Sequence, residues 1–451
     1  MSKRKISILG AGLVGSLTAI LLEQRGYEVK VYERRDDMRN QKLSAGRSIN
    51  LAMSTRGWKA LEMAGVKKQI MEIAIPMFGR ELHLHNETDK FQAYGKNNEA
   101  IYSVSRGALN RKLMSLAEEN GVEFFFNQKC THVDIEKNTF SLNDAKTIEA
   151  DLLIGADGAF SSLRTAYTKT DRCDYHQFYI EHGYKELSIP AFDNAAHRIK
   201  KEALHIWPRE SYMMIALPNL DGSFTCTLFF PFEGELSFDS IKTKEDVQKF
   251  YSEKFPDAIP LMPNLLEDYF NNPTASLVTI KCGKYTHKEK SLILGDAAHP
   301  IVPFYGQGMN AGFEDCSILM ELLDKNKHDW TSTLNDFQNS RVKDGHAIAD
   351  LALQNFIEMR DLVTDEGFLL RKKLEKEIGR LFPNDFNSVY EMVSFSHLPY
   401  SYAWSCRQAQ DALMNSLVND KRFKDGIIGE SEIPLIEEKL KSYAAEISAL
   451  A

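Results

Sequence analysis

Hydrophobic and polar positions alternate differently along the chain, and the first residues carry the clearest pattern. The apolar run Ile6-Ser7-Ile8-Leu9 predicts a short buried strand, and the apolar positions from Leu13 to Arg25 fall on one face of a helix. Glu28 to Tyr32 predicts a second strand. This order predicts a βαβ unit and therefore a parallel sheet.

Later segments extend the same sheet. Ser105 to Glu119 predicts a helix, and Val122 to Phe126 predicts a strand that follows it. The apolar segment Asp151 to Gly158 predicts a strand that ends on an Asp-Gly turn, and Ser291 to Leu294 predicts a buried strand that leads into Gly295. The first sheet is therefore expected to draw its strands from distant parts of the chain.

The residues between these segments follow a two-residue period instead. From Tyr175 to Ile280 the chain is rich in strand formers, and Asn219 to Gly222 predicts a hairpin turn. The expected strands are Tyr184 to Ile189, His205 to Trp207, Tyr212 to Leu217 and Phe224 to Phe230. This part predicts an inserted sheet, and everything after Ala311 is patterned as helices.

A glycine-rich turn, Gly10-Ala11-Gly12-Leu13-Val14-Gly15, lies between the first strand and its helix. In this pattern the first glycine makes a tight turn, the second lets a pyrophosphate approach the backbone, and the third lets the helix pack on the strand. Glu33, 18 residues after Gly15, is suitably placed for a ribose hydroxyl. The pattern alone does not separate FAD from NAD. Arg34 and Arg35 fit either an NADP phosphate contact or a solvated turn.

Two further motifs favour FAD. Asp157-Gly158 ends a predicted strand, where a backbone turn can meet a dinucleotide, and Gly295-Asp296-Ala297-Ala298-His299-Pro300 lies far downstream. A nicotinamide dehydrogenase that uses only the first glycine turn leaves both motifs unexplained. Together the three motifs indicate a flavin nucleotide.

Composition narrows the class of protein. The 451 residues exceed one ordinary domain, and the net charge of -8 argues against a nucleic-acid partner. Six cysteines without a CxxC pair favour reduced thiols in the cytoplasm and make a structural zinc unlikely. Lys3-Arg4-Lys5 resembles the start of a secretory signal, but the glycine spacing fits a folded strand and helix better. With no run of 18 apolar residues, we expect a cytoplasmic protein without a membrane anchor.

The three nucleotide motifs resemble those of the single-component flavoprotein aromatic hydroxylases, the para-hydroxybenzoate hydroxylase type. Within this class the chain is similar, nearly end to end, to the kynurenine 3-monooxygenase family. The segments that carry this similarity are Gly46 to Ala52, Tyr102 to Arg106, Gly183 to Leu187, Pro303 to Asp315 and Asn355 to Arg360. Mitochondrial members carry a hydrophobic membrane anchor at the C-terminus, which this chain lacks, so we expect a soluble bacterial form.

The resemblance implies an enzyme that hydroxylates L-kynurenine to 3-hydroxy-L-kynurenine with NADPH and O2, through a flavin C4a-hydroperoxide, in tryptophan degradation. It implies tightly but non-covalently bound FAD and an NADPH that binds transiently. The flavin performs the difficult chemistry, so the resemblance requires no protein nucleophile and no metal. The protein is expected to be a monomer or a homodimer.

The resemblance also implies roles for particular residues. Substrate binding is expected at Arg80, Tyr94, Asn355 and Tyr390, with Arg80 as partner of the substrate carboxylate. The wall of the oxygen-activation site is expected at Pro303, Gly306, Gln307 and Gly308. FAD binding is expected at Gly10, Gly12, Leu13, Val14, Gly15, Glu33, Arg34, Ala52, Arg106, Asp157, Asp296, Met309 and Asn310.

The fold implied is of the α/β class: a Rossmann-like FAD-binding domain, an inserted and mostly antiparallel substrate sheet, and a helical C-terminal region. The expected bounds are 1–75, 100–174 and 285–325 for the first, 76–99 and 175–284 for the second, and 326–451 for the third. Alternatives are a hydroxylase of another aromatic acid, an NAD(P) dehydrogenase, and a non-catalytic FAD-binding module. A flavin halogenase is disfavoured because none of the four tryptophans forms a WxWxIP element.

Overall fold

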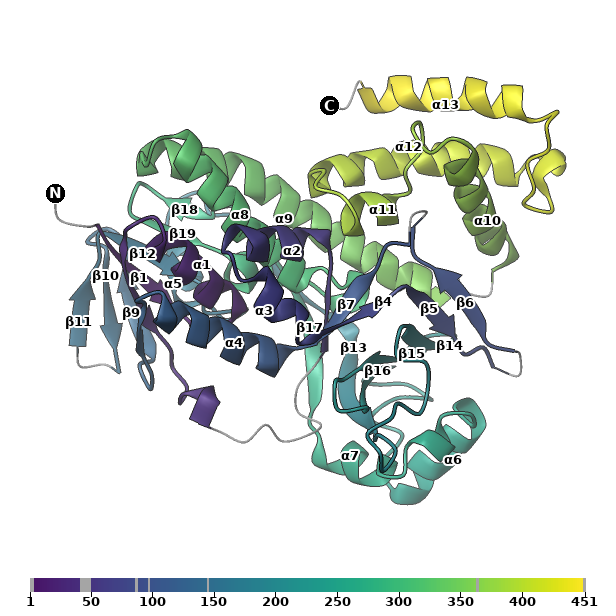
Figure 1. Cartoon of the computed structure of the whole chain (residues 1–451), viewed down its shortest axis with the longest axis horizontal. Coiled ribbons are helices and arrows are strands. Elements are labelled where there is room, and N and C mark those ends of the chain that lie inside the picture. Colours follow the sequence, from purple (N-terminus) through teal and green to yellow (C-terminus); the bar gives the residue numbers. More distant parts are fainter. Residues whose placement is uncertain are drawn as a thin grey trace.

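The computed structural model describes residues 4–40, 50–85, 88–95, 98–143, 146–361 and 365–448, without the side chains of 359–361. The first four residues of the segment Gly46 to Ala52 therefore lie outside the described residues, as do the side chains of Met359 and Arg360. Figure 1 shows a sheet with its helices at the N-terminal side, a second sheet below it, and helices of the C-terminal part above.

The first sheet has the order β18-β19-β12-β1-β2-β8. Its strands pair in parallel except β18, which pairs antiparallel to β19. The bounds are β1 Lys5–Leu9, β2 Glu28–Tyr32, β8 Glu123–Phe125, β12 Leu152–Gly155, β18 Thr286–His287 and β19 Ser291–Ile293. The predicted βαβ unit and the predicted return of the chain to this sheet are confirmed.

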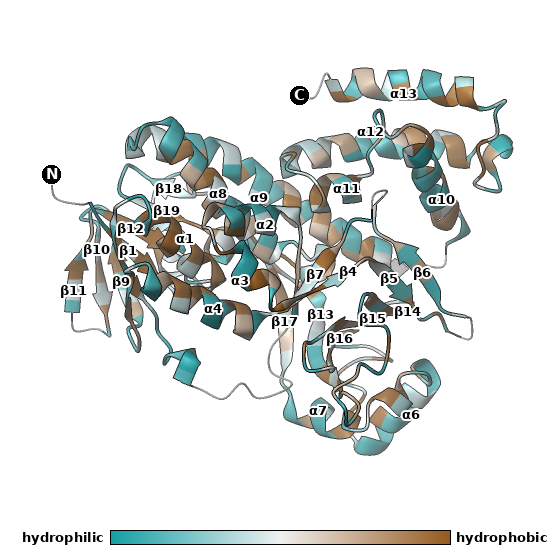
Figure 2. Cartoon of the chain, in the orientation of Figure 1, coloured by the Kyte–Doolittle hydropathy of each residue, from teal (hydrophilic) through white to brown (hydrophobic). Residues whose placement is uncertain are grey.

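Helices cover this sheet because their apolar faces complete its core. Helix α1 contacts both α4 and α8, and Figure 2 shows the hydrophobic colour concentrated on α1 and on the strands beside it. The bounds of the helices associated with this half are α1 Leu13–Glu23, α2 Thr55–Met63, α3 Lys67–Met71, α4 Arg106–Glu119 and α5 Ser162–Tyr167. Leu17, Ile20 and Leu21 are fully buried, as the helical pattern predicts.

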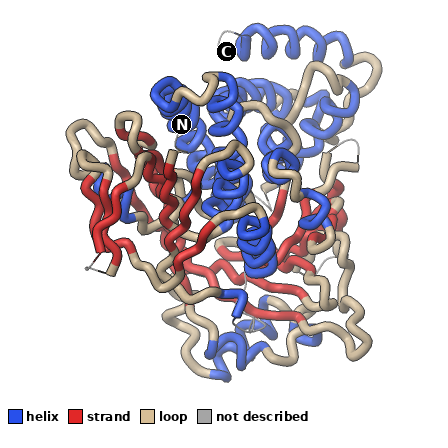
Figure 3. Tube along the Cα trace, turned by 60° about the vertical axis from the view of Figure 1, so that its left-hand side comes forward, coloured by secondary structure: helices blue, strands red, loops and turns tan. Residues whose placement is uncertain are grey.

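The second sheet has the order β17-β13-β16-β15-β14-β5-β6, and only β14 and β5 pair in parallel. The bounds are β5 Gly79–Leu82, β6 Lys90–Ala93, β13 Tyr175–Ile189, β14 Leu204–Arg209, β15 Tyr212–Pro218, β16 Phe224–Pro231 and β17 Thr274–Cys282. The predicted strands are found, and β13 is longer than predicted. Figure 3 shows the two groups of strands on either side of a block of helices.

Other elements differ from the sequence prediction. The strand-rich segment also contains α6 Lys244–Lys254 and α7 Leu265–Asn271, which close the far side of the second sheet. Two small sheets were not predicted, one with the order β3-β7-β4 and one with the order β11-β10-β9. Their bounds are β3 Asn50–Met53, β4 Ala74–Met77, β7 Ile101–Ser105, β9 Cys130–Asp134, β10 Thr139–Leu142 and β11 Lys146–Glu149.

The last third of the chain is helical, as predicted, and it contributes two hydrophobic clusters. One cluster joins α9, α11 and α12 to the second sheet, and the other holds α10, α12 and α13 together. The bounds are α8 Gly308–Lys325, α9 Trp330–Asp361, α10 Glu366–Leu381, α11 Val389–Ser394, α12 Tyr400–Val418 and α13 Ile433–Ser448. Among the helices in the described residues, none is long and apolar enough to cross a membrane.

Candidate active site

One cavity of about 740 Å³ connects the two sheets. It begins at the carboxyl ends of β1, β2 and β12, where Gly10, Glu33 and Asp157 line it, and continues over one face of the second sheet to Arg80 and Tyr390. The carboxyl edge of a parallel sheet is where nucleotides bind in such folds. The cavity therefore brings the nucleotide motifs and the predicted substrate residues into one space.

The glycine turn at the start of the cavity has the geometry that its spacing predicts. Gly10 has a φ of +98°, and a Cβ there would come 2.5 Å from the carbonyl oxygen of Ala156. A Cβ on Gly15 would overlap the carbonyl oxygen of Gly10, so this glycine permits close packing of α1. A Cβ on Gly12 would meet nothing within 4 Å, which leaves open space above the helix N-terminus. Of the three, Gly15 does not line the cavity.

Glu33 is buried at the end of β2 and faces the same turn. Its carboxylate accepts hydrogen bonds from the backbone N–H of Ala11 at 2.9 Å and from the Arg35 side chain at 2.8 Å. Burial alone would raise the pKa of Glu33, but these hydrogen bonds and the charge of Arg35 outweigh burial and lower it. Glu33 is therefore an anion at the cavity. Arg34, which also lines the cavity, is exposed.

Asp157 and Asp296 bring two more carboxyl groups to this end of the cavity. Oδ2 of Asp157 accepts from the backbone N–H of Ser162 at 2.7 Å, whereas Oδ1 is buried without a hydrogen-bond partner in the part of the chain that is described. Burial raises the pKa of Asp157. An unpaired buried acceptor carries a free-energy cost, which a hydroxyl-bearing ligand would remove. The open turn at Gly12 and this acceptor both fit a dinucleotide such as FAD.

The segment before α8 forms another wall. Pro303, Gly306, Gly308 and Met309 line the cavity, and Gly306 adopts a left-handed φ of +67°. The side chain of Gln307 lies elsewhere, because its Oε1 accepts a hydrogen bond from the hydroxyl of Tyr400 at 2.9 Å. Only the backbone of Gln307 is thus available to the wall. Helix α8 begins at Gly308, so the backbone amides of its first turn have no partner within the helix and are directed toward the segment that precedes it.

Asn310 is fully buried and holds neighbouring segments together. Its Nδ2 donates to the carbonyl oxygens of Ala52 at 2.8 Å and Gly306 at 2.9 Å, and its Oδ1 accepts from the N–H of Ser54 at 2.8 Å. Its side chain is therefore occupied in fixing the loop against β3. Ala52 itself lines the cavity.

Arg80 lies at the far end of the cavity beside two tyrosines that stack on each other. The guanidinium carbon is 4.7 Å from the ring centroid of Tyr390 and 5.6 Å from that of Tyr94, and the two rings stack at 5.7 Å. Among the described residues no carboxylate pairs with Arg80, and its Nε has no hydrogen-bond partner. Burial raises the pKa of Tyr94, which is therefore a neutral phenol. An uncompensated cation in an aromatic setting is suited to bind an anion.

Two other residues named by the resemblance, Asn355 and Arg106, lie outside the cluster of Arg80, Tyr94 and Tyr390. Asn355, on α9, does not line the cavity; its Nδ2 donates to the carbonyl oxygen of Phe304 at 2.7 Å and so supports the wall from behind. Arg106, the first residue of α4, is exposed and lines the cavity. The structure thus brings Arg80, Tyr94 and Tyr390 together, and leaves Asn355 one layer behind them.

The floor of the cavity comes from residues that the sequence analysis did not single out. Strands β14, β15 and β16 turn eight side chains into it: Leu204, Ile206, Met213, Ile215, Leu217, Thr225, Thr227 and Phe229. Six of these are apolar, so an aromatic ring fits over this floor. The sequence showed the two-residue period of these strands, but it did not show which face of the sheet borders a cavity.

Below the Gly295-Asp296 turn lies a buried charged network. Oδ2 of Asp315 accepts from the backbone N–H of Gly295 at 2.8 Å and from Nε2 of His299 at 2.7 Å, and Oδ1 accepts from Nε of Arg341 at 2.7 Å. Burial opposes ionisation, but His299 and Arg341 outweigh it and lower the pKa of Asp315 to about 2. Asp315 therefore fixes the backbone immediately before Asp296.

The same network reaches the C-terminal helices through Arg56 on α2. Its guanidinium pairs with Glu314, which also pairs with Arg341 at 3.0 Å. Arg56 donates to the carbonyl oxygens of Val393 at 3.0 Å and Met392 at 3.1 Å, both on α11. Since α11 also carries Tyr390, this contact places a tyrosine of the Arg80 cluster.

Comparison with known proteins agrees with this geometry. Residues 3–332 match the family model described as "FAD binding domain". A kynurenine 3-monooxygenase of Flavobacterium psychrophilum is 47% identical over 420 residues, which are 92% of this chain and 94% of that protein. A second, from Flavobacterium johnsoniae, is 46% identical and covers 97% of this chain and 98% of its own.

A solved structure supports the fold. A variant of HpxO from Klebsiella pneumoniae, in complex with FAD, superposes with a TM-score of 0.68 at 19% sequence identity. The match covers 84% of this chain and 97% of that one. At this identity the likeness establishes the fold alone.

Proposed function

Because the chain belongs to the kynurenine 3-monooxygenase family of FAD-dependent hydroxylases, we propose which of its residues hold the cofactor and the substrate. The enzyme binds FAD and hydroxylates L-kynurenine to 3-hydroxy-L-kynurenine, with NADPH as reductant and O2 as the source of the oxygen. One observation supports the residue assignment most: a single cavity runs from the glycine turn to an arginine that lacks a carboxylate partner among the described residues.

The nucleotide end of the cavity holds FAD in this proposal. The pyrophosphate lies over Gly12 at the N-terminus of α1, and Glu33 accepts a hydrogen bond from the adenosine ribose. Asp157 and Asp296 offer acceptors to other hydroxyls, and Arg106 offers a cation to the phosphates. The amides at the start of α8 face the region where reduced flavin carries negative charge. Leu13, Val14 and Arg34 complete this lining.

The far end holds the substrate. Arg80 pairs with the carboxylate of L-kynurenine, with the stacked rings of Tyr94 and Tyr390 beside the guanidinium. Asn355 acts through the carbonyl of Phe304, which it holds in place. The apolar floor carries the aromatic ring and excludes water from it.

Bound FAD supplies the redox chemistry: it takes up a hydride from NADPH and activates dioxygen. This chain's contribution is orientation and shielding. Arg80 fixes one end of the substrate, the backbone from Pro303 to Gly308 borders the reacting edge, and the floor keeps the ring in one plane. In this proposal Arg80 neither takes up nor releases a proton.

An assay on the purified holoprotein tests the function. NADPH oxidation is measured with L-kynurenine and with other aromatic acids, while hydroxylated product and hydrogen peroxide are counted separately. We expect fast oxidation and nearly stoichiometric product with L-kynurenine, and slow oxidation with more peroxide for poorer acids. Another aromatic acid with a higher kcat/KM and full product yield would establish the alternative function, hydroxylation of that acid.

The division into domains and the cellular location follow from the same proposal. We propose the FAD-binding, substrate-binding and C-terminal helical parts with the bounds given for the sequence, and a cytoplasmic protein that is a monomer or a homodimer. Gel filtration with light scattering tests the oligomeric state.

A further inference from the structure

Two threonines on β16 differ in what their hydroxyls contact. Thr225 and Thr227 both face the cavity and are 9% and 6% exposed. Oγ1 of Thr225 accepts a hydrogen bond from Nδ2 of Asn219 at 3.1 Å. Within the described parts of the chain, Oγ1 of Thr227 has no hydrogen-bond partner, although it is not sealed from the cavity. Thr227 therefore presents a free hydroxyl in an apolar floor.

The sheet places this hydroxyl at a defined distance from Arg80. The strand order puts β16 three strands from β5, which carries Arg80, and this corresponds to about 14 Å across the strands at roughly 4.8 Å per strand. Thr227 lies in the row of Leu82, two residues along the strand from Arg80, so the two backbone positions are about 16 Å apart. Ile206, Ile215 and Thr227 are neighbours across β14, β15 and β16, and all three line the cavity. An elongated ligand held by its anionic end at Arg80 thus passes over apolar side chains before it reaches Thr227.

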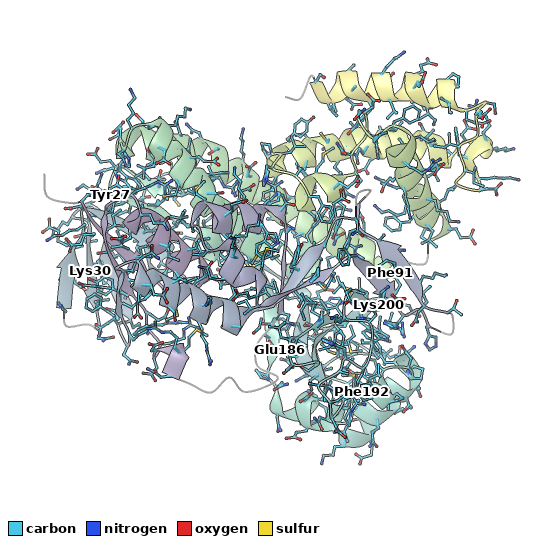
Figure 4. The ribbon with its side chains drawn as sticks, viewed as in Figure 1. Tyr27, Lys30, Phe91, Glu186, Phe192 and Lys200 are labelled. Atoms are coloured by element: carbon cyan, nitrogen blue, oxygen red, sulfur yellow. The ribbon has the colours of Figure 1, made fainter. Side chains whose placement is uncertain are left out.

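On the other side of Thr227 the paired residue is Glu186 of β13. Glu186 does not line the cavity, and Figure 4 shows it at the junction between the two sheets. Phe229, one step along β16, is apolar. Among the residues of β14, β15 and β16 that line the cavity, Thr227 is therefore the polar side chain without a hydrogen-bond partner in the described residues.

A ring that carries an amino group needs a partner at this place. L-Kynurenine bears a carboxylate at one end and, at the other, a ring with an amino group beside a ketone. One amino hydrogen can bond to the ketone within the molecule, which leaves the other without an acceptor once the ring leaves water. Burying a polar group without a hydrogen bond is unfavourable.

We propose that Thr227 accepts a hydrogen bond from the ring amino group of the substrate and thereby selects acids whose ring carries this group. The proposal rests on the proposed function. With the carboxylate at Arg80 and the amino group at Thr227, the ring has two fixed points and cannot turn over in its pocket. The carbon next to the amino group is then held toward the flavin, so Thr227 also determines which ring position is hydroxylated.

Three variants separate this role from a structural one. Thr227→Val removes the hydroxyl and keeps the shape, Thr227→Ser keeps the hydroxyl, and Thr279→Val removes a buried hydroxyl on β17 that does not line the cavity. Each holoprotein is titrated with L-kynurenine and with its deamino analogue, in which hydrogen replaces the ring amino group. Binding is followed by the perturbation of flavin absorbance, and product and peroxide are counted in turnover.

For Thr227→Val we expect about 2- to 12-fold weaker binding of L-kynurenine, the usual effect of losing one neutral hydrogen bond, and a larger share of peroxide. Binding of the deamino analogue should stay within about twofold, since it never made this contact. Thr227→Ser should restore most of the affinity, and Thr279→Val should bind both ligands like the unaltered protein. FAD content should be the same in all four proteins.

Two results would overturn the inference: an equal loss for both ligands in Thr227→Val, or no loss for either. Failure of the proposed function looks different, because the unaltered protein would then neither bind nor hydroxylate L-kynurenine. Normal hydroxylation by the unaltered protein together with an insensitive Thr227→Val refutes only the role of Thr227.

Discussion

Arg80 is a cation inside the molecule whose charge no described carboxylate neutralises, and its neighbours there are two aromatic rings. Arg80→Met should weaken L-kynurenine binding by about 2 to 5 kcal/mol, because it leaves the substrate carboxylate without a partner. That is roughly a 30-fold to several thousand-fold rise in the kinetic constant KM. Arg80→Lys should recover part of the loss, since it keeps the charge without the planar fork.

The control for Arg80 is a cation of the same sheet region that faces outward. Nζ of Lys200 lies 3.7 Å from the ring centroid of Phe91, and both residues are labelled in Figure 4. The side chain of Lys200 is 48% exposed. Lys200→Met should leave KM unchanged, and FAD content should be normal in every one of these variants. An unchanged KM in Arg80→Met would contradict the assigned pocket.

Gly12 and Gly15 allow a contrast between loss of cofactor and loss of fold. A side chain on Gly12 enters open space where the pyrophosphate is proposed, so Gly12→Val should fold and bind little FAD. A side chain on Gly15 would overlap the backbone at Gly10, so Gly15→Val should lower the yield of folded protein. Absorbance at flavin wavelengths and the circular dichroism spectrum measure the two effects. A normally yellow, active Gly12→Val would contradict the assignment.

At the scale of elements, Asp315 joins the turn before Asp296 to α9 through Arg341. Its pKa of about 2 in the folded protein lies below its ordinary value of 3.8, so the unfolded chain binds the proton more tightly. Its charge therefore stabilises the fold fully above about pH 5, and this contribution of about 2 kcal/mol is lost as the pH falls to 2.

The measurement compares the holoprotein with Asp315→Asn in chemical denaturation at several pH values. The variant should be less stable at pH 7, because Arg341 and His299 lose a carboxylate partner in a buried network. The difference in free energy of unfolding between the two proteins should shrink by about 2 kcal/mol between pH 5 and pH 2. A difference that is the same at both pH values would show that Asp315 is not an anion in the fold.

Sequence patterns predicted the elements that have one clear period. The strand at Ile6 and the helix from Leu13 were found, because β1 is a continuous buried run and the apolar positions of α1 lie in the core. Helix α6 was missed inside a strand-rich segment, although Thr243 and Asp246 form the capping box that begins it. The two small sheets were missed because each of their strands has only four or five residues, too few for a period to be recognised in the sequence.

The site was predictable where a motif carries it and not where the tertiary fold creates it. Gly10 and Glu33 follow from spacing, and Arg80 followed only from resemblance to known enzymes. The side chain of Gln307 turns toward Tyr400, and Asn355 lies behind the wall, because each satisfies a buried partner that the sequence does not reveal. Thr227 could not be foreseen, since a threonine in a strand is ordinary and only the cavity makes its hydroxyl informative.

For the whole molecule, Arg56 connects the FAD-binding half to the C-terminal helices. It donates to carbonyl oxygens of α11 and lies 3.9 Å from the ring centroid of Tyr400 on α12. Arg56→Met should loosen this docking and withdraw Tyr390 from Arg80, because a fully buried cation is lost from several partners at once. We expect faster limited proteolysis within residues 365–448 and a higher KM for L-kynurenine.

Arg422→Met provides the control for Arg56. Arg422 pairs with Asp420 in the same C-terminal region, but its side chain is 56% exposed and its pair contributes little. This variant should match the unaltered protein in both measurements. If Arg56→Met digests no faster than Arg422→Met, then hydrophobic packing alone holds the C-terminal helices in place.

The chain leaves the part built on the first sheet at Tyr175 and returns to it after Cys282. These two residues are paired across the β13–β17 ladder. A segment whose two ends meet is the kind that can be exchanged within a fold, but here β14 inside the segment pairs with β5 outside it, so any replacement must keep this pairing. Strand β5 lies outside this segment, so the arginine for the acid belongs to the rest of the chain, while Thr227 and Phe229 belong to the segment. In the proposed assignment the residue that binds the acid and the residue that selects the ring therefore lie in different segments. An exchange of residues 175–282 that keeps the pairing with β5 should change the preferred ring and retain the binding of the acid at Arg80.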